Sequence, residues 1–163
     1  MTLRNAGVCL VFGLSLALCS CKQEQRGGPR IAVHPIHGEV FVDGKPAKDA
    51  FVHLYPDKPH DNPNPNLGVM SQGQVDADGK FEISTYEHGD GAPAGKYKIS
   101  ITWNKASGLT LNQWGGPDRL KGKYADPKKT GFELEVPEQH EGPVIIPRFD
   151  LTLDNKSNKS KKK

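Results

Sequence analysis

Six histidines are the first candidates for chemistry, because imidazole can bind a metal ion or act as a general acid or base. A zinc peptidase needs His-Glu-x-x-His or His-x-x-Glu spacing, and neither pattern occurs in the chain. His34 and His37 fall on opposite faces of an extended segment, so joint metal ligation would require a bend. We therefore expect no metal site and no cofactor.

The segment from Asp76 to Gly79 begins like a calcium-binding loop, with the sequence Asp-Ala-Asp-Gly. The later ligands and the closing glutamate of such a loop are missing, so a hairpin turn is the better interpretation. Motifs for a nucleophile elbow or a phosphate-binding loop are also missing. Glu133 and Glu135 lie on a predicted solvent face, where carboxylates mainly confer solubility. The sequence predicts no catalytic residue and no enzyme.

The two tryptophans have different surroundings. Trp103 continues the apolar side of a predicted strand, so we expect it in the core. Trp114 precedes Gly115, Gly116 and Pro117 in a long loop, and two interpretations of it remain open. An exposed Trp114 ring would favour recognition of a sugar or a protein partner, whereas a buried ring would close one end of the domain. Trp114 is therefore the candidate ligand-binding residue.

The first 20 residues have the pattern of a secretory signal peptide. Arg4 is the single charge of Met1 to Asn5, and an almost unbroken apolar run follows from Ala6 to Leu18. This run is shorter than the ~20 residues that a transmembrane helix needs. A buried N-terminal helix is the alternative, but a polar stretch with glycine and proline follows at once.

Leu18-Cys19-Ser20-Cys21 resembles the bacterial lipobox, in which the final cysteine receives a diacylglycerol group. Cys21 fits this register, whereas Cys19 would place Leu18 where a small residue is required. Cleavage before Cys21 leaves it as the sole remaining cysteine, so no internal disulfide is possible. The resemblance implies an exported protein anchored to a bacterial membrane by acyl chains such as palmitate, on the periplasmic or cell-surface side. Ordinary secretion with a free or intermolecular Cys21 is the alternative.

The charge is unevenly distributed along the chain. Six of the 22 basic residues lie in the leader or the last nine residues, which leaves 16 basic against 19 acidic residues in between. This central part offers no electrostatic footprint for nucleic acid. We expect residues 155–163, rich in lysine, serine and asparagine, to form a disordered basic tail, and residues 21–35 to form a flexible tether.

Alternation of apolar and polar residues predicts seven short strands between residues 36 and 154. The 18 glycines and 13 prolines suit short strands joined by turns, and no segment has apolar residues at helical spacing over three turns. The pattern favours an antiparallel β-sandwich. The segments are His37–Val42, Phe51–Tyr55, Val69–Val75, Phe81–Ser84, Gly95–Trp103, Phe132–Val136 and Phe149–Asp154.

Turn signals separate these segments. Asp43-Gly44 and Asp78-Gly79 predict hairpins, since glycine adopts positive φ without steric cost. Pro56 to Asn66 contains four prolines and predicts an exposed loop. The connection from Ala106 to Lys128 is long, so we expect it to cover one end of the domain or to carry function.

Three segments resemble carboxypeptidase regulatory-like domains, which have a transthyretin-like β-sandwich. The first runs from Gly38 to Val52 and contains Asp-Gly-Lys-Pro; the second is Val-Asp-Ala-Asp-Gly-Lys-Phe from Val75 to Phe81. The third is the Pro-Ala-Gly-Lys-Tyr entry to the strand at Tyr97. The resemblance covers about residues 36–154 and is closest to small bacterial lipoproteins that carry this domain alone. It implies an all-β, seven-stranded fold and a non-catalytic accessory role.

These patterns divide the chain into a signal peptide (1–20), a lipid-acceptor cysteine and tether (21–35), a β-sandwich domain (36–154) and a basic tail (155–163). The expected function is non-enzymatic binding, adhesion or scaffolding in the cell envelope, with an envelope protein or polysaccharide as partner. The alternative is a carbohydrate- or peptide-binding accessory subunit of an envelope enzyme or transporter. An unrecognised hydrolase is the least favoured class.

Overall fold

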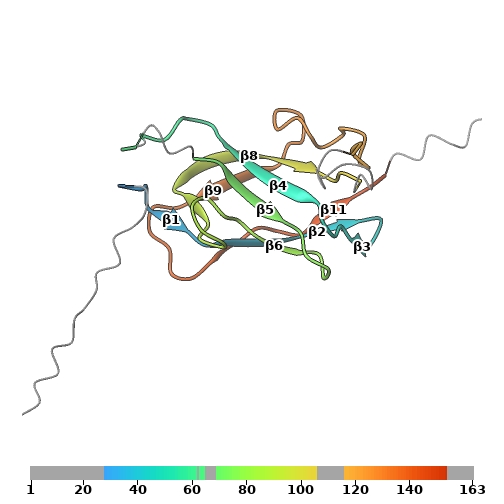
Figure 1. Ribbon diagram of the computed structural model, residues 1–163, viewed down its shortest axis with the longest axis horizontal. Coiled ribbons are helices and arrows are strands. Elements are labelled where there is room, and N and C mark those ends of the chain that lie inside the picture. Colours follow the sequence, from blue (N-terminus) through green and yellow to red (C-terminus); the bar gives the residue numbers. More distant parts are fainter. Residues whose placement is uncertain (1–27, 62, 65–68, 106–115, 154–163) are drawn as a thin grey trace, which may run out of the picture.

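The computed structural model describes residues 28–61, 63–64, 69–105 and 116–153. Over these residues the fold is all-β, with eleven strands and no helix (Figure 1). The described part of the chain therefore contains no helix that is long and apolar enough to cross a membrane. The prediction of an all-β protein is confirmed.

Each of the seven predicted segments overlaps a strand of at least three residues, with boundaries that differ by up to two residues at either end in most cases. These strands are β2 (Ile36–Val42), β4 (Phe51–Pro56), β5 (Ser71–Gln74), β6 (Lys80–Glu82), β8 (Gly95–Thr102), β9 (Glu133–Val136) and β11 (Phe149–Leu151). Four further strands have two residues each, which is too short for an alternating pattern to show. They are β1 (Val33–His34), β3 (Lys45–Pro46), β7 (Ala92–Pro93) and β10 (Val144–Ile145).

Two main sheets enclose the core. One sheet is built around β2, which pairs with β3, β6, β10 and β11, and the other has the strand order β5-β4-β8-β9. The short strands β1 and β7 form a separate two-stranded sheet at one end (Figure 1). The inner faces of both main sheets contribute side chains to a single hydrophobic cluster.

Alternation along the strands explains this core. In β2, every second residue from Ile36 to Val42 is buried, and in β8 the side chains of Tyr97, Ile99 and Ile101 are buried. Phe81 of β6 and Phe149 of β11 add stacked rings with centroids 6.5 Å apart. Burial of these apolar side chains is the main stabilising contribution to the fold.

Strand direction differs from the antiparallel arrangement that the sequence predicted. Both β10 and β11 run parallel to β2, with Val144 opposite Ile36 and Phe149 opposite Val40. The connection after β9 crosses from one sheet to the other and brings the chain back beside β2 in the same direction. Alternation specifies which face of a strand is buried but not the direction of its neighbour, so the sequence pattern could not reveal these pairings.

The ordered body begins earlier than the predicted boundary at residue 36. Val33 and His34, assigned by sequence to a flexible tether, pair with Pro93 and Ala92 of β7. Farther upstream, the guanidinium of Arg30 lies 2.8 Å from the Glu87 carboxylate. The prediction of a tether rested on polar composition, and composition cannot reveal a strand of only two residues.

The Asp-Gly turns form as predicted. Asp43 and Gly44 both have positive φ, 49° and 77°, and their turn leads into the short strand β3 rather than directly to β4. In the second hairpin, Asp76 Oδ1 accepts hydrogen bonds from the amides of Asp78 and Lys80 at 2.9 and 2.8 Å. This carboxylate therefore stabilises the turn, as the hairpin interpretation requires.

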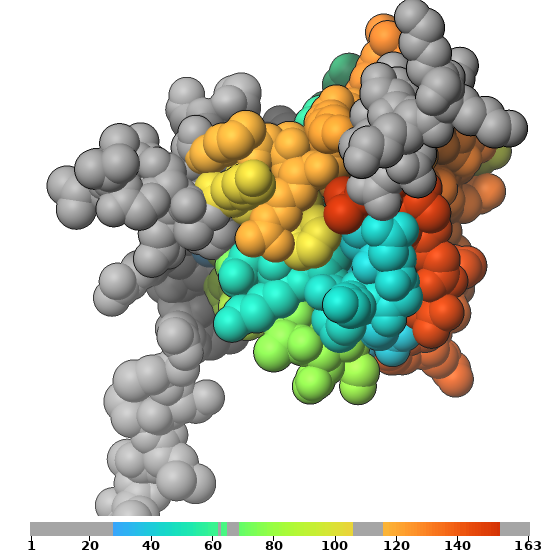
Figure 2. Space-filling model, turned by 90° about the vertical axis from the view of Figure 1, so that its right-hand side faces the viewer, coloured from blue at the N-terminus to red at the C-terminus, as the bar shows by residue number. Residues whose placement is uncertain are grey.

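The described part of the long connection, residues 116–128, folds against one end of the sheets. Leu120 is buried in the core, and Asp118 bridges to Asn104 just beyond β8. Figure 2 shows this end of the molecule, with the segment in orange against the yellow end of β8. Trp103 is half-buried there: its Nε1 donates to the carbonyl of Lys48 at 2.8 Å, and Arg119 lies 4.5 Å from its ring.

Candidate functional site

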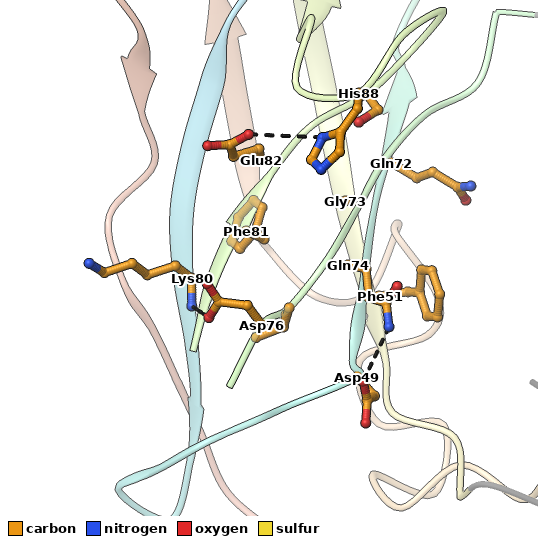
Figure 3. A pocket seen from close by; sticks show the side chains of 12 residues that line it. Asp49, Phe51, Gln72, Gly73, Gln74, Asp76, Lys80, Phe81, Glu82 and His88 are labelled. Carbon is orange, nitrogen blue, oxygen red and sulfur yellow. Dashed lines mark hydrogen bonds and ion pairs between the residues drawn. The ribbon is translucent and has the colours of Figure 1, made fainter. Parts of the chain in front are cut away.

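A surface groove with a volume of about 690 Å³ follows the hairpin formed by β5 and β6. Most of its lining residues have polar side chains, and they come from β4, β5, β6 and the loops beside them, as Figure 3 shows from close by. We call it the hairpin groove. The residues that line it are Asp49, Phe51, Gln72, Gly73, Gln74, Val75, Asp76, Lys80, Phe81, Glu82, Ser84 and His88.

The groove exists because the two strands of the hairpin belong to different sheets. β5 pairs with β4, whereas β6 pairs with β2. Backbone hydrogen bonds join the hairpin at two places: between Gln72 and Ser84, and between Asp76 and Lys80. Between these two places each strand follows its own sheet, which leaves a concavity along the hairpin.

Gly73 allows the close approach of β5 and β6 beside the groove. A Cβ at Gly73 would lie 2.5 Å from the carbonyl oxygen of Glu82 and 3.2 Å from the ring of Phe81. Real Cβ atoms essentially never come so near a backbone oxygen, so a larger residue would force the strands apart. The absence of a side chain at Gly73 therefore permits β5 and β6 to lie this close together.

One wall of the groove carries an aromatic ring and an amide. Phe51 stacks on His53 of the same strand, with centroids 6.0 Å apart and an interplanar angle of 18°. Gln74 donates from Nε2 to Asp49 Oδ1 at 3.2 Å, and Figure 3 shows this pair below the Phe51 ring. The wall therefore combines an apolar surface with amide and carboxylate groups.

The opposite wall carries Glu82 between two histidines. Its carboxylate oxygens lie 3.9 Å from His37 Nε2 and 4.0 Å from His88 Nδ1. All three side chains are substantially exposed, so these contacts contribute little to stability. Ser84 Oγ accepts a hydrogen bond from the Gly89 amide at 2.9 Å and is thereby held in place.

His53 lies on the outer face of the sheet, directly beside the groove wall. It pairs across the sheet with Gln72 on β5 and with Ser100 on β8. Burial lowers the pKa of His53, and a hydrogen bond with the Gln72 side chain offsets part of this effect. The imidazole is therefore favoured in its neutral form beside the stacked Phe51 ring.

A smaller groove of about 350 Å³ lies on the other side of β6. It is lined by residues of β2, β6 and β10 and of the connection that follows β10, including Gly38, Ile145 and Arg148. A Cβ at Gly38 would come within 2.5 Å of the Phe81 ring, which fills the space that this glycine leaves. β6 therefore separates two concavities.

The two sequence-predicted site residues, Cys21 and Trp114, lie outside the described residues. His34 and His37 lie on different strands, β1 and β2. Among the residues that the structure describes, no group of three or more His, Cys, Asp or Glu side chains is arranged to hold a metal ion. What the groove offers chemically is hydrogen bonding and ring contact.

Sequence reasoning did not identify the hairpin groove. Its clearest signal was β4, where Phe51 and Tyr55 are apolar although they alternate with the core residues Val52 and Leu54. Aromatic side chains on the outer face of a strand indicate either an interaction surface or a face that another segment partly covers. The Gln72 and Gln74 side chains offered no comparable signal, because isolated amides on a strand are common on solvent faces.

Comparisons with known proteins assign no family. No family model matches the chain, and no curated protein matches it. One solved structure, a 9R-lipoxygenase from Cyanothece PCC8801, is similar over 81% of this chain and 18% of that chain, at 13% identity and a TM-score of 0.38. This chain thus spans less than a fifth of the lipoxygenase, and so low a TM-score supports no inference about fold or activity.

Proposed function

We propose that this protein is a non-enzymatic, lipid-anchored binding module of the bacterial cell envelope. The observation that supports the binding role is the hairpin groove, a concavity between two sheets whose lining residues are mostly polar and include Phe51 at one edge. Ligand sites are typically such preformed concavities of about 300–1,000 Å³. The apolar leader and Cys21 support export and the lipid anchor.

We also propose a specific fold type for the β-sandwich domain. The Asp-Gly turns and the two sheets around one core are compatible with a seven-stranded transthyretin-like β-sandwich of the carboxypeptidase regulatory-like type. In this arrangement the four two-residue strands are additions to the seven longer ones. The resemblance of the turn motifs is the support for this assignment, because turn chemistry follows fold more closely than function.

The anchor would hold the body near the membrane. The eight residues from 22 to 29, which separate Cys21 from the ion pair of Arg30 with Glu87, span at most about 29 Å. Figure 1 shows β1 at one end of the long axis and β11 at the other. The β1 end would therefore lie closest to the lipid headgroups, with the opposite end presented outward.

Phase partitioning of cell extracts in Triton X-114 tests the anchor. The full chain expressed in a bacterium should enter the detergent phase, because acyl chains bind micelles. The Cys21→Ser variant should move to the aqueous phase, since the described body exposes few large apolar side chains. Recovery of the wild-type protein in the aqueous phase would argue against lipidation.

The alternative function, an accessory subunit that binds carbohydrate or peptide for an envelope enzyme or transporter, uses the same groove. The Phe51 ring beside Gln72 and Gln74 favours it, because rings and amides together recognise ligands with both apolar and polar faces. The two candidate functions differ in partner rather than in site.

A further inference from the structure

We infer that residues 116–130 form a cationic surface that binds an anionic polysaccharide. We call these residues the cationic segment. It contains five basic and two acidic residues, whereas the rest of the described body contains nine basic and fifteen acidic residues. Positive charge is therefore concentrated on one segment of a body that is otherwise acidic. Such a patch attracts polyanions although the whole body does not.

The cationic segment is fixed along the C-terminal half of β8. The amide of Arg119 donates to the carbonyl of Trp103 at 2.7 Å, and the amide of Ile101 donates to the carbonyl of Tyr124 at 2.8 Å. Leu120 is buried in the core. The five basic residues are nevertheless exposed, and Figure 2 shows the segment at the surface in orange. The charges therefore lie on an ordered surface.

The two carboxylates of the segment make contacts of their own. Asp118 accepts hydrogen bonds from three backbone amides at distances from 2.8 to 3.0 Å, and so stabilises a turn. Asp126 forms an ion pair with Lys129 at 3.0 Å. Among the residues that the structure describes, no carboxylate forms an ion pair with Arg119 or Lys128. These two cations can therefore bind an external anion.

Arg119 is held in a geometry that suits a planar anion. Its guanidinium lies 4.5 Å from the centroid of the Trp103 ring. A stacked guanidinium keeps its in-plane N–H groups available, and these match the paired oxygens of a carboxylate or phosphate. Two further exposed lysines adjoin this pair: the carbonyl of Lys48 accepts from Trp103 Nε1, and the amide of Lys105 donates to the carbonyl of Pro117.

The described part of the chain ends beside the cationic segment. The amide of Thr152 donates to the Tyr124 hydroxyl at 3.4 Å, and Lys123 Nζ donates to the Thr152 hydroxyl at 3.2 Å. Residues 155–163, which follow, contain five lysines and no acidic residue. Further positive charge is therefore attached to the body next to the segment, which strengthens the attraction for a polyanion.

A polysaccharide is the polyanion that the arrangement favours, and this choice rests on the proposed location in the cell envelope. The anchor would bring the β1 end nearest to the lipid headgroups. The cationic segment follows the C-terminal half of β8, which points toward the β11 end (Figure 1). An envelope polysaccharide that carries carboxylate or phosphate groups could reach this end, whereas the lipid surface would lie at the other.

Fluorescence polarisation of a labelled polygalacturonate fragment tests the inference. The full-chain Cys21→Ser variant is the background protein, because it removes the lipid acceptor and leaves the described body unchanged. The fragment should bind at about 50 mM salt. Its affinity should fall by about tenfold or more at about 500 mM, because salt screens exposed charges. A labelled dextran fragment, which is neutral, should not bind.

Two substitutions in the cationic segment locate the binding surface. The Arg119→Gln/Lys128→Gln variant should bind polygalacturonate about 25-fold more weakly, since each cation that faces a dense anionic surface contributes about fivefold. Lys58→Gln/Lys80→Gln is the matched control, because it removes the same charge at exposed positions outside the segment. Its affinity should equal that of the background protein. Circular dichroism spectra of both variants separate misfolding from lost binding.

Three results would overturn the inference. They are no binding at low salt, equal loss in both double variants, or equal affinity of Arg119→Gln/Lys128→Gln and the background protein. The second result would show an effect of net charge alone, and the third would leave the binding to the lysines of residues 155–163.

Sedimentation with vesicles tests a lipid surface as the partner. The background protein should sediment equally with phosphatidylcholine vesicles and with vesicles that also contain phosphatidylglycerol. A preference for phosphatidylglycerol that Arg119→Gln/Lys128→Gln removes would assign the segment to anionic lipid and reject the polysaccharide. Failure of the proposed location is distinguishable from both outcomes. A wild-type protein that stays in the aqueous phase of Triton X-114, with polygalacturonate binding retained, would reject the anchor and keep the cationic surface.

Discussion

At the scale of single residues, His53 beside the hairpin groove has a poorly solvated environment. His53 lies between β5 and β8 on the outer face of the sheet, opposite Gln72 and Ser100. Ser100 is only 1% exposed, and its Oγ has no hydrogen-bond partner within the described part of the chain. Together with the Phe51 stack, these contacts place the imidazole in a poorly solvated position, where the neutral form is favoured.

The lowered pKa of His53 predicts an acid-dependent loss of stability. In the unfolded chain His53 binds a proton near its ordinary pKa of about 6.5, but in the folded chain it does so only at lower pH. Between these two values the unfolded state binds more protons, so stability is fully present above about pH 6.5 and falls as pH decreases through the folded pKa. Burial lowers the pKa of His60 as well, which adds an effect of the same sign.

Denaturant unfolding of wild type and His53→Phe at pH 7.5 and pH 5 measures this effect. Phenylalanine keeps a ring against Phe51 and cannot be protonated. The variant should lose less stability than the wild type between the two pH values, with the remainder reflecting His60. Equal losses in both proteins would show that His53 is not the titrating group.

At the scale of elements, the strand segments could be predicted but their partners could not. Alternation of Tyr97, Ile99 and Ile101 with polar residues marked β8 correctly, and the Asp-Gly turns marked two hairpins. The parallel pairing of β11 with β2 depends on a crossover between sheets, for which the local sequence has no signal. The two-residue strands are likewise defined only by their partners.

The hairpin groove was missed for the same reason. Its walls depend on β5 and β6 pairing with different sheets, which is a property of the tertiary structure. In sequence, Ser71 to Gln74 is a short polar segment with a glycine. The significance of Gly73 appears only when Glu82 is placed beside it.

Gly91, next to β7, allows β1 to pair with β7, which leads to a prediction about stability. This glycine has φ +95°, and a Cβ there would overlap the carbonyl oxygen of His34. The Gly91→Ala variant should therefore force β1 away from β7 and lower the free energy of unfolding. The cost should exceed that of positive φ alone by about 1–3 kcal/mol, the usual range for overpacking.

Gly122→Ala is the matched control for Gly91→Ala. Gly122 also has positive φ, +76°, but a Cβ there would meet no atom within 4 Å. It should show only the cost of the left-handed conformation, about 1–2 kcal/mol. Urea unfolding of both variants gives the comparison, and equal losses would contradict a steric role for Gly91.

At the scale of the whole molecule, the described body has two distinguishable ends (Figure 1). The ion pair of Arg30 with Glu87 lies near the β1 end, and β11 lies toward the opposite end (Figure 1). The strands β4, β5 and β6, which contribute to the hairpin groove, lie between these ends (Figure 1). An anchor at residue 21 would therefore leave the groove accessible from the side, where a polymer of the envelope could reach it.

Mass spectrometry of the mature N-terminus tests the central claim, a lipid-anchored module, most directly. The protein would be purified from bacterial membranes in detergent and digested, and its N-terminal peptide analysed intact. We predict that the mature chain starts at Cys21 and carries diacylglycerol on its sulfur. A mature chain that starts elsewhere, or at an unmodified Cys21, would contradict it.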